Sequence, residues 1–338
     1  RGSAIFVEFF FALSGFVLAH GYAYKDNLKF FTFMKSRFFR LYPLHAFMFF
    51  VIFTLEVGNL LAYDIGGFIS SKEPFTASKD VQEIIPNLLL IQSWTPYTEP
   101  LSFNGPSWSI SIEFYMYALL FGSIITFRKN KEIAWLISSI TAFLLIYLQS
   151  SIVTSEVLRG ISCFFGGAFA YYLFVRTPTF NINKTIGTGI EILLLIMIIA
   201  TVQTTFDHRS LVASLLFIVT VFCFAFELGA ISGLFKAKPF QVIGKLSYSI
   251  YMTHFAIISC LKVAATLIQK ITKIPLTTTS ETGVGLDFGS ATLNNIMIFI
   301  TLIIVIAISN ITYKYIEVTG QKLSARNKKQ NVHLQQET

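Results

Sequence analysis

Long apolar runs separated by short polar segments recur along this chain of 338 residues. A helix needs about 20 mostly apolar residues to cross the ~30 Å hydrocarbon core of a bilayer, and the runs have about that length. None alternates with the two-residue period of a barrel strand, so helices are expected to satisfy the backbone in lipid. The pattern predicts an all-α, polytopic transmembrane helix bundle. About nine spans are expected, at residues 4–23, 41–63, 107–127, 132–149, 155–175, 186–205, 210–231, 246–268 and 292–314.

Composition supports a membrane protein. Hydrophobic residues make up 54% of the chain and charged residues only 13%, whereas soluble domains carry roughly 25% charged residues. A net charge of +8 can indicate nucleic-acid binding, but the basic residues lie in short loops, where membrane topology explains them without a nucleic-acid partner. The three cysteines, Cys163, Cys223 and Cys260, fall within apolar runs. We interpret them as reduced core residues with no disulfide or metal role.

The distribution of basic residues predicts the orientation. Most of them lie in alternate loops and in the C-terminal tail, so this side is expected to be cytoplasmic. The C-terminus is then inside and the N-terminus outside. Because no signal peptide is visible, we expect a further helix to precede this chain, giving about ten. Residues 1–316 are expected to form one membrane domain and residues 317–338 a polar, basic cytoplasmic tail. The outward loop 64–106 holds a short amphipathic segment near residues 81–92.

A pair of arginines precedes the second predicted span. Arg37 and Arg40 are spaced i, i+3, so they share one face of a helix and can hold phosphate oxygens in a bidentate manner. Ordinary anchoring at the cytoplasmic boundary explains the same pair. Pro43 suits the first turn of the following span. His45 is expected to face the bundle or to reach the interface.

Two further segments place polar groups within apolar helices. In the first span, Glu8 is an ionisable group in the outer half, and Ser14-Gly15 permits close approach of another helix or of an acyl chain. Before the third span, Asn104-Gly105-Pro106 predicts a turn, with Ser107 as the N-cap of a helix. Trp108 fits an interfacial aromatic belt. Ser109 and Glu113, at i and i+4, can line one polar stripe, and a buried carboxylate facing the bundle is a functional candidate.

The eighth predicted span carries a third polar face. Ser247, Tyr251 and His254 recur at i, i+4 and i+7. His254 can relay protons, and a structural histidine satisfied by hydrogen bonds explains it equally well. Arg159 begins another span and is either an anchor at the outer face or the partner of an inward carboxylate. No group of residues has the spacing of a metal site.

Taken together, these segments resemble the membrane-bound acyltransferase-3 family, which O-acylates surface polysaccharides and related glycans in bacteria. The matching residues extend in order along nearly the whole chain. They are the Phe-Phe-x-x-Leu-Ser-Gly-Phe run ending at Phe16, Arg-x-x-Arg-Leu-Tyr-Pro at Arg37–Pro43, Pro-x-Trp-Ser-x-Ser-x-Glu-Phe at Pro106–Phe114, Ser-Tyr-Ser-x-Tyr-x-x-His at Ser247–His254, and a weaker ending at Tyr313–Glu317.

The resemblance implies a bacterial inner-membrane enzyme that moves an acyl group, with acetyl the expected one, from cytoplasmic acyl-CoA to a hydroxyl of a surface glycan. No cofactor is expected to be bound permanently. A polar passage through the bundle would let the donor reach inward. The residues assigned on this basis are Arg37, Arg40, Tyr42, His45 and Ser14 for the donor, Glu113 and His254 for catalysis, and Trp108, Ser109 and Arg159 for the acceptor.

One departure from the family pattern concerns catalysis. The family's proposed catalytic histidine lies on its first helix, eleven residues after a basic residue. In this chain only Lys322 and His333 show that spacing, and we attribute it to coincidence because both lie in the predicted tail. The chain is therefore expected to lack the helix that bears this base and to be an inactive fragment of an active protein, a pseudo-enzyme or a shortened gene product.

Two other functions fit parts of the pattern. A transporter or flippase for a lipid-linked sugar would use Glu8, Glu113 and His254 as a proton path. The chain shows neither duplicated halves nor paired helices broken by Gly or Pro, which such transporters often have. A non-catalytic assembly subunit is the third interpretation.

Overall fold

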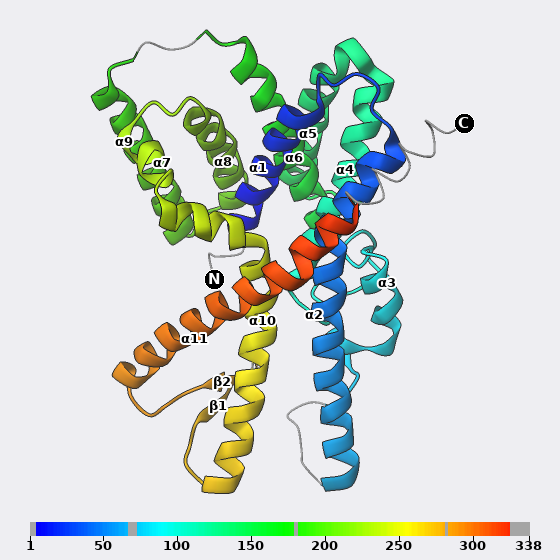
Figure 1. Cartoon of the computed structure of the whole chain (residues 1–338), viewed down its shortest axis with the longest axis vertical. Helices are drawn as coiled ribbons and strands as arrows, with labels where there is room; N and C mark the ends of the chain where they lie inside the picture. The colour runs from blue at the N-terminus through cyan, green and yellow to red at the C-terminus, as the bar shows by residue number, and fades with distance from the viewer. Residues whose placement is uncertain (1–4, 67–72, 179–181, 281–282, 325–338) are drawn as a thin grey trace. The chain divides into compact units, whose positions relative to one another are not determined.

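The computed structural model describes residues 5–66, 73–178, 182–280 and 283–324, which are predominantly helical (Figure 1). The chain divides into two compact units, each assembled from separate stretches of sequence. Unit 1 comprises residues 1–34, 93–97 and 111–242. Unit 2 comprises residues 35–92, 98–110 and 243–338.

The helices confirm the all-α prediction. A helix coincides with each predicted span, and six helical stretches of the described chain are long and apolar enough to cross a membrane. Two shorter apolar helices, α1 and α8, accompany them. The major helices are α1 (Phe6–Tyr22), α2 (Phe30–Gly66), α4 (Ser107–Phe127), α5 (Lys131–Tyr147), α6 (Ser155–Arg176), α7 (Lys184–Gln203), α8 (Arg209–Ala225), α10 (Lys238–Thr272) and α11 (Ala291–Thr312).

Short elements connect these helices. The predicted amphipathic segment contains a 3₁₀ turn, η3, followed by helix α3. Strands β1 and β2 form an antiparallel hairpin between α10 and α11, with Thr277 opposite Leu286 (Figure 1). The short elements are η2 (Ala77–Lys79), η3 (Val81–Glu83), α3 (Ile84–Leu88), η4 (Arg128–Asn130), α9 (Ala230–Phe235), β1 (Thr277–Ser280), β2 (Gly283–Leu286) and η5 (Tyr313–Glu317).

In unit 1, helix α6 packs against α1, α5 and α8. Glycines allow α1 and α6 to approach closely. A Cβ added at Gly15 would lie 1.9 Å from the carbonyl oxygen of Phe164, and one added at Gly167 would lie 1.9 Å from that of Ala12. The two glycines thus make reciprocal contacts with the facing backbone, as small residues do at interfaces between membrane helices. The prediction that Ser14-Gly15 admits another helix is confirmed.

In unit 2, hydrogen bonds of buried side chains join distant parts of the sequence. The Tyr248 hydroxyl on α10 donates to the carbonyl oxygen of Leu41 on α2 at 2.6 Å. The hydroxyls of Thr253 on α10 and Ser309 on α11 lie 2.8 Å apart. Each of these polar groups is buried, and its hydrogen bond offsets the free-energy cost of burying it. Helix α10 is therefore fixed to both α2 and α11.

The start of the second span differs from the prediction. Helix α2 begins at Phe30, so Pro43 lies inside the helix and not in its first turn. A proline cannot donate the bond that the carbonyl of Phe39, four residues earlier, would accept. Gly320 packs at this point, where a Cβ would lie 2.7 Å from the Phe39 oxygen and 2.9 Å from Pro43 Cγ. The proline thus leaves a carbonyl against which a second helix packs.

The C-terminal helix extends further than the predicted membrane domain. After α11, the π-helical turn η5 leads into helical residues that continue to Ser324. Glu317, placed at the start of the predicted tail, is buried and accepts a hydrogen bond from Ser249 Oγ at 3.0 Å. His333, the distant member of the basic–histidine spacing, lies outside the described residues. The first part of the predicted tail therefore packs within unit 2.

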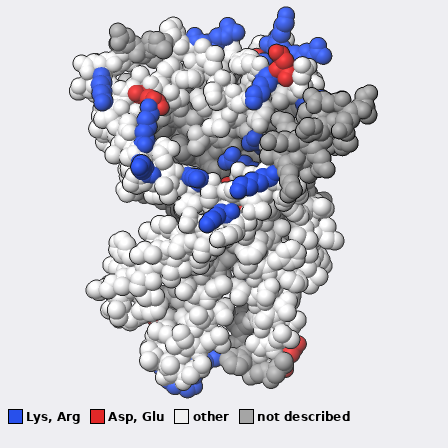
Figure 2. All heavy atoms as spheres, in the orientation of Figure 1, with Lys and Arg blue, Asp and Glu red and all other residues white. Residues whose placement is uncertain are grey.

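Charged side chains are sparse on the visible face of the molecule. Figure 2 shows a surface that is mostly uncharged, on which Lys and Arg are more frequent than Asp and Glu. Many large apolar side chains are exposed, among them Phe31 and Ile303. Such exposure is typical of helices that contact lipid, since soluble proteins rarely leave large apolar patches uncovered.

Candidate functional site

The predicted site residues fall into both units. Ser14, Glu113 and Arg159 belong to unit 1. The remaining residues of the predicted site belong to unit 2, namely Arg37, Arg40, Tyr42, His45, Trp108, Ser109 and His254. Each unit therefore has its own group of functional candidates.

Glu113 is the centre of the group in unit 1. It is 2% exposed, and its Oε1 accepts a hydrogen bond from Ser14 Oγ on α1 at 2.8 Å. The same oxygen accepts a bond from the Tyr117 hydroxyl, one turn further along α4. Two hydroxyl donors on one oxygen stabilise a carboxylate and fix its direction. The sequence identified Ser14 and Glu113 separately, and the structure brings them together.

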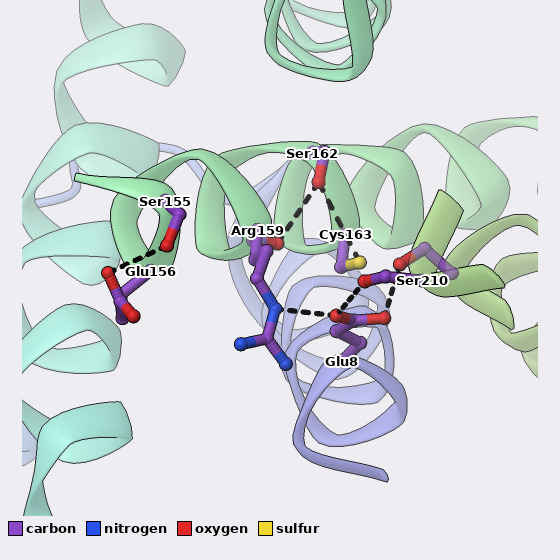
Figure 3. Close-up of polar contacts among 8 residues, drawn as sticks. Glu8, Ser155, Glu156, Arg159, Ser162, Cys163 and Ser210 are labelled. Atoms are coloured by element: carbon purple, nitrogen blue, oxygen red, sulfur yellow. Dashed lines mark hydrogen bonds and ion pairs between the residues drawn. The ribbon is translucent and has the colours of Figure 1, made fainter. Parts of the chain in front are cut away.

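Arg159 partners an inward carboxylate, which confirms one of the two alternatives for this residue. Its Nε lies 2.6 Å from Glu8 Oε1, and the Glu8 side chain is fully buried (Figure 3). Ser210 and Ser214 on α8 also donate to the Glu8 carboxylate, each at 2.6 Å. The ion pair thus joins α1, α6 and α8. The terminal nitrogens of Arg159 point away from Glu8 in Figure 3.

The arginine pair lies on helix α2 in unit 2. Arg37 is half-buried and Arg40 exposed. Arg40 lies within electrostatic range of the buried carboxylate of Glu317. On the same stretch of helix, the ring of Tyr42 stacks on Phe38 with a centroid distance of 4.4 Å.

Two lysines belong to elements that contact this stretch of α2. Lys245 is one turn before Tyr248, whose hydroxyl bonds to Leu41, and its Nζ lies 5.1 Å from the ring centroid of Tyr313. Lys314 follows Tyr313 in η5. Residues Arg37, Arg40, Lys245 and Lys314, here called the basic cluster, thus come from three elements of unit 2.

His45 faces the interior, which was one of its two predicted positions. It is fully buried, and its Nε2 lies 2.9 Å from the carbonyl oxygen of Asn87, which is near the C-terminal end of α3. Asn87 Nδ2 in turn donates to Ser102 Oγ at 2.7 Å. The outward loop is therefore fastened to α2 through this histidine. Its role in donor binding stays a prediction.

The predicted polar residues at the start of α4 and those on α10 meet in unit 2. Ser109 Oγ on α4 donates to the Tyr251 hydroxyl on α10 at 2.9 Å. Asn104 Nδ2, in the predicted turn, donates to the carbonyl oxygen of Met252 at 3.2 Å. Trp108 is buried and is not an exposed belt residue. The start of α4 is thus attached to the middle of α10.

The polar face of α10 differs from the predicted one. Ser247 is exposed, whereas Ser249 and Thr253 are fully buried. His254 is half-buried, and its Nδ1 lies 3.2 Å from the carbonyl oxygen of Ile250 in its own helix. The i, i+4, i+7 spacing identifies a polar face of Ser247, Tyr251 and His254. Helix packing instead buries the adjacent face, which carries Ser249 and Thr253. Local bonding of His254 is consistent with its structural interpretation.

Several buried carboxylates were not identified from sequence. Glu56 on α2 pairs with Lys79 of the outward loop. Glu191 on α7 accepts hydrogen bonds from Gly229 N at 2.9 Å and from Ser232 Oγ at 2.6 Å, which caps helix α9. Both lie within predicted spans, where any ionisable residue is a signal in itself. Among the described residues, no group of three or more His, Cys, Asp or Glu is arranged to hold a metal ion.

Comparison with known proteins gives a consistent result. The acyltransferase-3 family, described as an acyltransferase domain, matches residues 2–314. The chain is 37% identical over 116 residues to acyltransferase MdmB of Streptomyces mycarofaciens, a match that covers 34% of this chain and 26% of that protein. The chain thus spans about a quarter of the length of this curated relative. No solved structure matches the chain significantly.

Proposed function

The chain belongs to the acyltransferase-3 family, and we propose that it transfers an acyl group, in the simplest case acetyl, from acyl-CoA to a hydroxyl of a cell-surface glycan or related acceptor. An acyltransferase with several apolar helices acts at a lipid bilayer. The basic loops support a bacterial inner membrane in which the C-terminus is cytoplasmic.

The basic cluster of unit 2 is the observation that carries this proposal. Arg37 and Arg40 share one face of α2, and Lys245 and Lys314 lie on elements that pack against the same stretch. Guanidinium groups bind phosphate in a bidentate manner, and lysines add point charges. CoA carries several phosphate groups on its nucleotide portion. Four basic residues on contacting elements, with the carboxylate of Glu317 near Arg40, give this part of unit 2 the excess of positive charge that such a ligand needs.

Glu113 is proposed to act in the transfer step of unit 1. In that step the acceptor hydroxyl oxygen forms a bond to the thioester carbonyl carbon, the carbon–sulfur bond breaks, and the hydroxyl proton passes to a base and finally to the CoA thiolate. A carboxylate held by Ser14 and Tyr117 can orient that base and stabilise its protonated form. We therefore assign Glu113 as a positioning residue.

The remaining residues have supporting roles in this proposal. Trp108 and Ser109 are proposed to contact the acceptor, and the hydrogen bond between Ser109 and Tyr251 would fix that surface. His254 is proposed to supply polar contacts. Ser14 is proposed to lie near the acyl chain of the donor as well as to orient Glu113. Tyr42 and His45 are proposed to line the donor site beside the arginines.

Thioester consumption tests the proposal. The full-length protein, reconstituted in vesicles with acetyl-CoA, should release free CoA faster when a glycan acceptor is present. The Glu113→Gln variant should lose about 10²-fold in transfer rate, the lower range for a catalytic proton-transfer group, while remaining folded. Glu191→Gln is the matched control, because it also removes a buried carboxylate from unit 1 but acts only on the capping of α9.

Two outcomes would contradict the proposal. The first is movement of a labelled glycan across the vesicle membrane without CoA release, which would identify a transporter. The second is an equal loss of transfer rate in Glu113→Gln and Glu191→Gln at equal thermal stability, because positioning would then not depend on Glu113.

A further inference from the structure

A cavity of about 820 Å³ opens at one end of unit 1. It is bounded by the ends of α5, α6 and α8, by the segment between α7 and α8, and by Ile5 before α1. Its volume falls in the range of small-molecule sites. The polar groups that line it are mainly those of Gln149, Ser150, Ser155, Arg159, His208 and Arg209.

The charged residues that line this cavity are arginines. Arg159 and Arg209 line it, and no aspartate or glutamate does. Glu8 compensates the charge of Arg159 through the ion pair drawn in Figure 3. Arg209 donates to the carbonyl oxygen of Thr204 at 3.1 Å and forms no ion pair with a described carboxylate. Two carboxylates lie next to the lining: Glu156 accepts a hydrogen bond from Ser155 at 3.0 Å, and Asp207 lies between Phe206 and His208 in sequence. Neither forms an ion pair with Arg209, so the guanidinium of Arg209 is the cation that this lining offers to a ligand.

Helix ends add positive potential beside Arg209. Helices α6 and α8 both begin at the cavity, and α1 begins beside it. The residues that precede α1 and α8, Ile5 and His208, provide no side-chain cap for the first amide groups. Helix N-termini with such amides favour an anion. The C-terminal ends of α5 and α7 oppose this effect, but their last turns bond internally and Arg209 satisfies the Thr204 carbonyl.

The remaining walls suit a hydroxylated molecule. The hydroxyl of Ser150 and the amide of Gln149 can exchange hydrogen bonds with sugar hydroxyls. Ser155 donates its proton to Glu156 at 3.0 Å, and its oxygen can still accept a bond. Phe206 lines the cavity, and the ring of His208 lies 4.9 Å from that of Tyr147, so aromatic faces are available for the apolar side of a sugar ring. Isoleucine and leucine side chains complete the walls, so a ligand that combines hydroxyls and one negative charge with an apolar face fits them best.

We propose that this cavity binds a further part of the acceptor, in addition to the part proposed to contact Trp108 and Ser109, and that this part carries a carboxylate or phosphate group next to its hydroxyls. The identification of the ligand as the acceptor rests on the proposed function. The basic loops support the same assignment, because they place this end of unit 1 on the outer side of the membrane, where a surface glycan is found. Two sources share this chemistry, a uronate-type sugar and a glycerophosphate unit.

Direct binding measurements test the proposal without any acyl donor. The probes are methyl glucuronide, methyl glucoside and glycerol 1-phosphate, added to the full-length protein in phosphatidylcholine nanodiscs. The wild type should bind an anionic probe at least about 10-fold more tightly than methyl glucoside, as a charge-assisted contact gives. The anionic probe that binds more tightly identifies the source of the natural group.

Variants of Arg209 connect this preference to the cavity. Arg209→Gln should reduce anionic-probe affinity by about 10-fold and leave methyl glucoside binding unchanged, whereas Arg209→Lys should retain most of the preference. Arg176→Gln removes a cation from the opposite end of α6 and should have no effect. Thermal melting of each variant confirms that it is folded.

Equal affinity of the wild type for charged and neutral probes would overturn the proposal, and so would an equal loss in Arg209→Gln and Arg176→Gln. Failure of the proposed function gives a different result. In that case the anionic probe binds and depends on Arg209, but no CoA is released in the vesicle assay.

Discussion

The contact between α1 and α6 predicts that a single methyl group at Gly15 will destabilise unit 1. In Gly15→Ala, the new Cβ would lie 1.9 Å from the carbonyl oxygen of Phe164, whereas real Cβ contacts are essentially never shorter than 3.0 Å. The obstacle is backbone, which cannot rotate away as a side chain can. The two helices must therefore separate by about 1 Å or bend at this point, with loss of close packing.

The magnitude follows from two opposing effects. Replacing glycine by alanine inside a helix stabilises the helix by up to about 1 kcal/mol. Overpacking of a closely packed interface costs about 1–3 kcal/mol, and more when backbone must move. The free energy of unfolding should therefore fall by about 1–3 kcal/mol for Gly15→Ala. Gly21→Ala on the same helix has nothing within 4 Å of its new Cβ and should be neutral or slightly stabilising.

Unfolding measured in detergent micelles, by heat or by denaturant, compares the two variants. The double variant Gly15→Ala/Gly167→Ala should cost less than the sum of its single variants, because both methyl groups separate the same pair of helices. Equal stability of Gly15→Ala and Gly21→Ala would refute the reciprocal glycine contact.

Three further predictions concern other contacts. Arg159→Met should destabilise the protein by about 3–5 kcal/mol, because it leaves the charge of Glu8 buried, and Glu8→Gln should cost less, since the Arg159 side chain is 21% exposed and can be hydrated. Denaturant unfolding checks this order, with Glu227→Gln at an exposed ion pair as control. Burial, reinforced by Glu132, raises the pKa of Tyr24 to about 12 from an ordinary value of 10.0. Stability from the neutral Tyr24 is therefore fully present below pH 10 and lost as the pH rises through 12, and ultraviolet titration of phenolate should show a lower pKa for Tyr24 in Glu132→Gln. Gly320→Leu should detach the C-terminal helix from α2, which protease cleavage after residue 317 would report, while Gly244→Leu, with open space around its Cβ, should resist cleavage.

The positions of the helices could be predicted from sequence because apolar length alone determines them. The start of α2 could not, because Lys35, Arg37 and Arg40 interrupt the apolar run although they continue the helix. Hydropathy indicates whether a segment contacts lipid or water. Where a helix extends beyond the lipid, its residues become polar, and hydropathy no longer indicates that they are helical. Pro43 strengthened the error, since proline is common at the start of a helix and its neighbour Gly320 is distant in sequence.

The candidate site was only partly predictable for the same kind of reason. Ionisable residues within apolar runs identified Glu8, Glu113 and Arg159, and the structure buries or pairs each of them. The same signal was overlooked at Glu56 and Glu191, which are equally buried. Their partners were not predictable, because Tyr117, Ser210 and Ser214 are common residues that acquire a role only through packing. Which face of α10 is buried likewise depends on its contacts with α2 and α11, so the spacing of residues within α10 could not predict it.

The most direct test compares donors with and without the nucleotide of CoA. Acetyl-CoA should bind the full-length protein at least about 10-fold more tightly than acetyl-pantetheine, because only the former offers phosphates to the basic cluster. Arg37→Ala/Arg40→Ala should abolish that difference and leave acetyl-pantetheine binding unchanged, while Lys25→Ala/Lys29→Ala, which removes the same charge from the preceding segment, should preserve it. Equal affinity of the arginine variant and the wild type for acetyl-CoA would contradict the assignment of the donor site.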